Sequence, residues 1–269
     1  SLQVSLQRRF AKSFSLGVAY TLSKTTTTAA DEGVLTHVSD PKNYDYALAA
    51  FDRTHFFVAN FVWNLPKASS HLSNHWLAKG VLDDWTLSGI TTLASGNPAE
   101  LGLSISGQDA GNRVLGAYSN GNLAAQAPRL RISGNPQNAP NEINLNAFVV
   151  PGITDVGPYR RMYLRNPGIN VTDLAVLKNI PFGERAKLQL RLEAFNAFNQ
   201  TQFSGVNRTN NITNGANQTG AAIFNDYTGL KITNNLRPAG STATLGTFFG
   251  EYNAARDPRI VQVAVKFLF

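Results

Sequence analysis

The last eleven residues of the chain, 259–269, alternate between apolar side chains and polar or small ones. Gln262 and Lys266 fall on one side of this alternation. The apolar side is formed by Val261, Val263, Val265, Phe267 and Phe269. A period of two is that of a β-strand, so the stretch predicts a strand with one polar and one greasy face. The apolar face must be buried, either against lipid or in the core of a β-sandwich.

The composition favours an all-β chain. The 269 residues include 22 Gly and 12 Pro, with 10% aromatic and only 15% charged residues, which suits strands separated by polar loops. Cysteine is absent, which excludes disulfide-stapled scaffolds and thiolate metal sites. No run approaches the roughly 18 consecutive apolar residues of a membrane helix, so a membrane location would require a barrel.

The formal net charge is +7, from 24 basic and 17 acidic residues. The basic residues are scattered singly or in pairs, such as Arg8-Arg9 and Arg160-Arg161, without a cluster interleaved with aromatics. We therefore expect no nucleic-acid binding. An anionic membrane surface would account for the excess charge as well.

Six further segments carry the same alternation. Together with the last strand they give seven predicted strands, at residues 2–10, 14–24, 54–65, 84–95, 169–180, 185–198 and 259–269. The long connections between antiparallel strands of this order all fall on one side, as in outer-membrane barrels. The sequence predicts an antiparallel transmembrane β-barrel segment with short periplasmic turns and long extracellular loops. Because the chain opens in a strand and its only methionine is Met162, we expect it to be the C-terminal portion of a longer barrel protein.

Two connections contain weaker patterns. Residues 71–77, His-Leu-Ser-Asn-His-Trp-Leu, predict a short amphipathic helix at the membrane interface. Residues 101–105 carry a strand pattern that would extend the sheet beyond the membrane.

One face of the predicted strands carries polar and charged side chains that would line the lumen. These are Gln3, Gln7, Arg9, Asp173, Gln189, Arg191, Glu193, Gln262 and Lys266. A charge on the lipid face would cost about 2–4 kcal/mol near the bilayer midplane, which favours the inward assignment. We expect a structural hydrogen-bonding ladder, with contact to a transported solute as the alternative.

Aromatic residues mark two other kinds of position. Trp63 and Trp85 lie near strand ends, where an aromatic belt would meet the membrane surface. Six tyrosines in the long loops could contact a ligand or could pack the loops together. They are Tyr44, Tyr46, Tyr159, Tyr163, Tyr227 and Tyr252.

As a set, these segments resemble the C-terminal third of the β-barrel of TonB-dependent receptors, in particular the Oar-like branch. The matching segments are LQVSLQRRF (2–10), GVAYTLSK (17–24), DRTHFFVAN (52–60), WTLSGI (85–90) with SGNP (95–98), DLAVLKN (173–179), LQLRLEAFNAFN (188–199) and the last strand. The resemblance implies about 22 strands, of which these would be the last seven. It also implies that Val265, Phe267 and Phe269 form a C-terminal signal for the barrel-assembly machinery.

The same resemblance implies a place in the outer membrane of a Gram-negative bacterium, among lipid and lipopolysaccharide. External loops would bind an unknown ligand, and a plug and TonB box upstream of this chain would couple its passage to the TonB complex. No cofactor is implied. A passive porin or adhesin barrel and a soluble β-sandwich binding module stay open as alternatives.

Patterns for catalysis and metal binding are weak. His71 and His75 could share a helical face, but no third ligand has a fixed spacing nearby, although Asp83 and Asp84 follow. No nucleophile-elbow, zinc-protease or phosphate-loop motif occurs. His55 is the only histidine in a predicted strand, so we expect no enzyme, no catalytic residue and no metal site.

Overall fold

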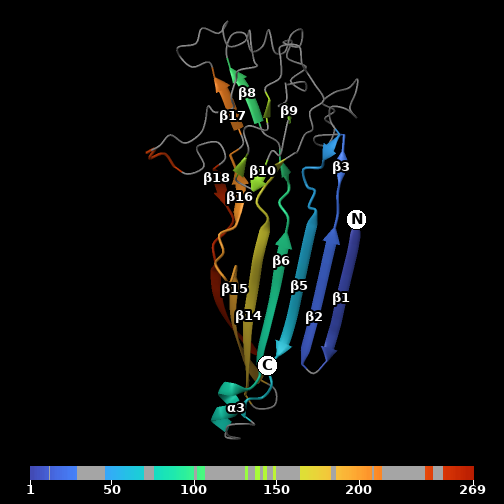
Figure 1. Ribbon diagram of the computed structural model, residues 1–269. Helices are drawn as coiled ribbons and strands as arrows, with labels where there is room; N and C mark the ends of the chain where they lie inside the picture. Colours follow the sequence, from blue (N-terminus) through green and yellow to red (C-terminus); the bar gives the residue numbers. More distant parts are fainter. Residues whose placement is uncertain are drawn as a thin grey trace.

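The structure is a computed structural model. It describes residues 1–11, 13–28, 46–69, 76–99, 102–106, 131–132, 137–139, 142–143, 148–149, 164–182, 186–207, 209–213, 240–244 and 251–269. Its main element is a seven-stranded antiparallel sheet whose strands are neighbours in chain order (Figure 1). The strands are β1 (Leu2–Ala11), β2 (Phe14–Leu22), β5 (His55–Asn64), β6 (Trp85–Ala94), β14 (Ile169–Phe182), β15 (Ala186–Phe195) and β19 (Ile260–Leu268). The predicted all-β, antiparallel fold is confirmed, and each long strand lies close to its predicted range.

The two ends of the sheet differ. At one end of the strands, here called the loop end, the long connections 23–54, 95–168 and 196–259 leave the sheet. At the other end of the strands, here called the turn end, they are joined by the connections 12–13, 65–84 and 183–185. In Figure 1 the loop end is at the top and the turn end is at the bottom. The predicted separation of long and short connections is therefore present.

The sheet is open. Its edge strands β1 and β19 are not hydrogen-bonded to each other. Because neighbouring strands are antiparallel and their number is odd, β1 and β19 both run from the loop end to the turn end. Joining them directly would create a parallel pair, whereas barrels of this kind use antiparallel pairs.

Short strands form six separate two-stranded sheets. These pair β3 (Thr26–Thr27) with β4 (Ala47–Leu48), β7 (Pro98–Ala99) with β13 (Leu164–Arg165), β8 (Gly102–Ser106) with β17 (Thr209–Thr213), β9 (Arg131–Ile132) with β12 (Phe148–Val149), β10 (Gln137–Ala139) with β11 (Glu142–Ile143), and β16 (Phe203–Val206) with β18 (Tyr252–Ala255). The predicted extension of the main sheet at 101–105 is wrong, because β8 pairs in parallel with β17. A short alternation specifies a strand but not its partner.

A short helix, α3 (Trp76–Leu82), lies at the turn end (Figure 1). The helix predicted at 71–77 overlaps it only at Trp76 and Leu77, and residues 70–75 lie outside the described residues. Within the described parts of the chain, no helix is long and apolar enough to cross a membrane.

Candidate functional site

Strand pairing sorts the side chains of the sheet onto two faces, because directly paired residues point to the same side. One row of pairs runs through Gly17, Asn60, Ile90 and Asp173. We call the face that carries this row the polar face. A row on the opposite face, which we call the apolar face, runs through Phe14, Trp63, Leu87, Val176, Leu192 and Val263.

Eight of the nine residues predicted to line the lumen lie on the polar face. Gln3 and Gln7 pair with residues of β2 on this face. The pairing does not set the face of Arg9, because the register of β1 and β2 shifts between Arg8 and Ala11. The other six alternate along β14, β15 and β19: Asp173, Gln189, Arg191, Glu193, Gln262 and Lys266. The chain thus gathers them on one surface.

Part of the polar face forms a ladder of side-chain hydrogen bonds. Gln189 Nε2 donates to Asn179 Oδ1 at 3.0 Å. Glu193 forms an ion pair with Arg191 on its own strand and accepts a hydrogen bond from Gln262 Nε2 on β19. Because these contacts join β14, β15 and β19, the polar residues stabilise strand pairing.

The apolar face leaves large hydrophobic side chains uncovered. Val263 is 73% exposed and Leu6 is 62% exposed. Water would penalise such a surface, whereas lipid would not. His55 at the loop end and Trp63 at the turn end are eight residues apart on β5, about 26 Å at the usual rise per residue. The whole strand has ten residues, and a tilted strand needs about 9–11 to cross the hydrocarbon core, so β5 is long enough to span it.

Aromatic and polar side chains border the apolar face at both ends. At the loop end Tyr20 Oη and His55 Nδ1 lie 2.8 Å apart. At the turn end Trp85 Nε1 donates to the Val81 carbonyl oxygen at 2.8 Å. The residues proposed as an assembly signal lie on β19 or just beyond it: Val265 and Phe267 on the apolar face, and Phe269 almost fully exposed.

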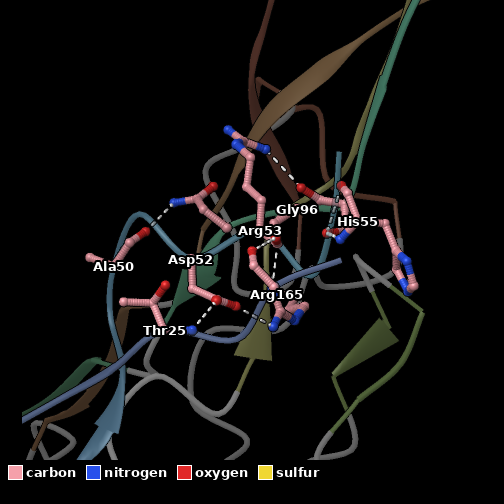
Figure 2. Close-up of polar contacts among 10 residues, drawn as sticks. Thr25, Ala50, Asp52, Arg53, His55, Gly96 and Arg165 are labelled. Carbon is pink, nitrogen blue, oxygen red and sulfur yellow. Dashed lines mark hydrogen bonds and ion pairs between the residues drawn. The ribbon is translucent and has the colours of Figure 1, made fainter. Parts of the chain in front are cut away.

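A polar network, which we call the loop clamp, joins the stems of the first two long connections (Figure 2). Asp52 is buried, and its carboxylate accepts hydrogen bonds from the Thr25 backbone N–H at 2.6 Å and from the Arg165 guanidinium at 2.9 Å. Arg165 also donates to the Gly96 carbonyl oxygen at 2.8 Å. Arg53 donates to the Ser95 carbonyl oxygen at 2.7 Å. Chain segments more than a hundred residues apart in sequence therefore meet at one carboxylate.

Gly96 allows the two halves of the clamp to approach closely. A Cβ atom placed on Gly96 would lie 1.5 Å from the Asn166 carbonyl oxygen, which is impossible without moving the backbone. Asn166 N–H donates to the Asn97 carbonyl oxygen at 2.9 Å, and Asn97 Nδ2 donates to the Ala50 carbonyl oxygen at 3.3 Å. The stems of both loops are thus held by backbone as well as by side chains.

Asn196 organises the third long connection where it leaves β15. It is buried and has a positive φ of 48°, which asparagine tolerates better than most residues. Its side chain donates to the Gln200 carbonyl oxygen at 2.9 Å and accepts from the Gln200 N–H at 3.1 Å. Its backbone N–H donates to Asp173 Oδ1 at 2.8 Å, so this turn is tied to β14.

The turn end contains a second buried carboxylate. Asp83 accepts hydrogen bonds from the Ser69 N–H at 3.0 Å and the Ser69 hydroxyl at 2.6 Å, and its own carbonyl oxygen accepts from Lys178 Nζ. The two Ser69 hydrogen bonds hold the pKa of the Asp83 carboxyl below its ordinary value, and they outweigh the opposing effect of burial. Lys178 Nζ lies 5.4 Å from the Trp85 ring centroid, a cation–π contact at the edge of the apolar face.

Two of the six loop tyrosines lie in the described residues. Tyr46 is 55% exposed, and its hydroxyl accepts from Thr26 Oγ1 at 3.1 Å. Tyr252 stacks on Phe203 with ring centroids 3.7 Å apart, so it packs β18 on β16. The others, Tyr44, Tyr159, Tyr163 and Tyr227, lie outside the described residues.

A family model described as outer membrane beta barrel domain matches residues 1–262. The chain belongs to the outer membrane beta barrel domain family. No curated protein and no solved structure gives a significant match to it. Membership in this barrel family assigns the uncovered apolar face to lipid and the protein to the outer membrane.

The described part of this barrel domain contains no cluster of three or more His, Asp or Glu side chains able to hold a metal ion. His71 and His75, the pair considered from the sequence, lie outside the described residues. The functional features of the described barrel domain are its polar face, its apolar face and the loop clamp.

Sequence reasoning missed the residues that organise the loop stems, namely Asp52, Arg165 and Asn196. A signal was present for two of them. Asp52 begins the segment 52–60 and Asn196 lies within 188–199, both of which carried the family resemblance. Arg165 had no local signal, because its partner is 113 residues away.

Proposed function

We propose that this barrel domain is the C-terminal part of a TonB-dependent receptor in the outer membrane of a Gram-negative bacterium. External loops bind a ligand, and a plug displaced by the TonB complex lets it pass through the lumen. The observation that carries the proposal is the open, two-faced sheet with clamped long connections at one end. Its polar face is suited to an enclosed lumen, and its unpaired edges require further strands.

The resemblance of the strand motifs supports a receptor in particular. On this proposal the barrel-assembly machinery recognises the last strand, and lipid and lipopolysaccharide contact the apolar face. The barrel has no enzymatic activity and binds no nucleic acid. The alternative within the same family is a passive porin or adhesin barrel.

The decisive experiment compares TonB binding with channel conductance. The full-length protein, with the region upstream of this chain, is purified in detergent from outer membranes, mixed with the purified periplasmic domain of TonB in a pull-down, and also inserted into planar lipid bilayers. A receptor binds the TonB domain and shows no steady conductance, because its plug closes the lumen. Steady open-channel currents without TonB binding would establish the porin alternative.

The assignment of the two faces has its own matched test on β19. Val263→Arg places a charge on the apolar face, and Gln262→Arg places the same charge beside Glu193 on the polar face. We expect Val263→Arg to destabilise the barrel by about 2–4 kcal/mol if Val263 lies near the midplane. Gln262→Arg should leave the midpoint of unfolding in detergent nearly unchanged. Equal effects of the two substitutions would refute the assignment.

A further inference from the structure

The polar face is not polar throughout. Four large apolar side chains on it are exposed: Phe56 (39%), Ile90 (51%), Phe195 (42%) and Ile260 (50%). Ile90 pairs directly with Asp173, and Phe195 pairs directly with Ile260. Exposed apolar side chains of this size on a face directed at the lumen are available to contact whatever occupies it.

Asp173 lies within this apolar group. Its Oδ1 accepts the Asn196 N–H at 2.8 Å. Within the described residues, Oδ2 has no hydrogen-bond or ion-pair partner. The nearest basic residue of β15 on this face, Arg191, pairs with Leu177, about 13 Å along β14 from Asp173, and is occupied by Glu193. One carboxylate oxygen is thus left without a compensating charge beside exposed Ile and Phe side chains.

We propose that Asp173, Ile90, Phe195 and Ile260 form a subsite for a small organic cation, an ammonium or guanidinium group attached to an apolar body. The cationic group binds Asp173 Oδ2, and the apolar body covers Ile90 and Ile260. Phe195 supplies a ring face that attracts a cation. An anionic solute would be repelled by Asp173, and a sugar would leave the apolar side chains poorly covered. The subsite deepens the proposed function, since it names the class of solute that the lumen would bind.

The test is equilibrium binding of three probes of matched shape to the purified protein in lipid nanodiscs, measured by saturation-transfer NMR. The probes are phenethylammonium, phenethyl alcohol and phenylacetate. We expect phenethylammonium to bind roughly fivefold more tightly than the alcohol, as a partly exposed ion pair allows, and phenylacetate to bind most weakly.

The key variant is Asp173→Asn, because the amide oxygen still accepts the Asn196 N–H while the charge is lost. It should bind the alcohol as the wild type does and lose the preference for phenethylammonium. Phe195→Ala should weaken the binding of both probes, and Asp84→Asn at the turn end should change neither. A cation preference that persists in Asp173→Asn, or a wild type without preference, would overturn the subsite.

These measurements need neither TonB nor an energy source, so the two proposals fail separately. Cation preference in a protein that does not bind TonB keeps the subsite and rejects the receptor. TonB binding without cation preference keeps the receptor and rejects the subsite.

Discussion

The loop end and the turn end of the sheet each bury one aspartate, and they satisfy it by different means. Asp52 at the loop end has an arginine from another connection, 113 residues away, and one backbone N–H. Asp83 at the turn end has the N–H and hydroxyl of Ser69, only 14 residues away in the same connection. The first carboxylate joins two connections, and the second closes one.

This difference matches the tasks of the two ends. The stems of the long connections at the loop end need contacts with each other, because strand pairing within the sheet does not fix the path of these connections. The connection at the turn end only has to return the chain from β5 to β6. An ion pair with a distant partner holds two separate chain segments together, whereas a local hydrogen bond holds one. Removing either partner of the ion pair leaves the other charge buried without compensation.

The largest effect is expected for Gly96→Ala at the loop end. The new methyl group would collide with the Asn166 carbonyl oxygen, which is backbone and cannot rotate away. We expect a loss of about 3 kcal/mol of unfolding free energy, the upper range for overpacking. Thermal unfolding in detergent, followed by the shift of the folded band on gels, measures it. An unchanged midpoint would mean that the clamp does not form as described.

Asp52→Asn should come next. The amide has one acceptor oxygen for two donors, the Thr25 N–H and the Arg165 guanidinium, so its NH₂ group must face one of them. We expect a loss of about 2 kcal/mol, less than for a fully buried pair because the Arg165 side chain is 30% exposed. Increased protease cleavage in the first two long connections should accompany it. Asp84→Asn, an exposed carboxylate with the same chemistry, is the control and should leave both readouts unchanged.

The turn end should respond to acid through Asp83. Because its folded pKa is lowered, the stabilisation is complete above the ordinary aspartate value of 3.8 and is lost as pH falls below it through the folded pKa. Trp85 fluorescence, in a Trp63→Phe and Trp76→Phe background, reports this transition. Ser69→Ala removes the principal cause of the lowered pKa, so the transition should move to higher pH. A transition at the same pH in Ser69→Ala would contradict the assignment.

The smallest effect, of opposite sign, is expected for Gly80→Ala in α3. A Cβ atom there meets nothing within 4 Å, so the substitution adds helix propensity without a clash. We expect a gain of about 0.5–1 kcal/mol if α3 unfolds together with the sheet. The same gel assay measures it, and a gain for Gly80→Ala with a loss for Gly96→Ala would sharpen the contrast between the ends. Destabilisation by Gly80→Ala would contradict the open space beside Gly80 and would mean that another part of the protein packs there.

The seven long strands could be predicted because their signal is local. In β15 the alternation of Leu188, Leu190 and Leu192 with Gln189, Arg191 and Glu193 fixes both the strand and its faces. Predicting these strands required only the two-residue alternation and no information on contacts between distant residues.

The loop clamp could not be predicted for the opposite reason. Nothing near Asp52 in the sequence indicates that its partner is Arg165 rather than Arg53, since both lie in polar connections that contain several basic residues. The helix α3 continues to Leu82, five residues beyond the amphipathic stretch at 71–77, because a pattern of a few residues does not set where a helix ends. The apolar group around Asp173 was also missed, since Ile90 and Phe195 come together only through strand register.

The loop clamp has a consequence for how the surface of this protein can change. It fixes the chain at Thr25, Asp52, Gly96 and Arg165, so the stems of two connections stay in place whatever lies beyond them. Lengthening a loop whose ends are already held costs little, because closure entropy grows only slowly with length. Foreign epitopes inserted beyond the clamp should therefore be displayed without disturbing the barrel.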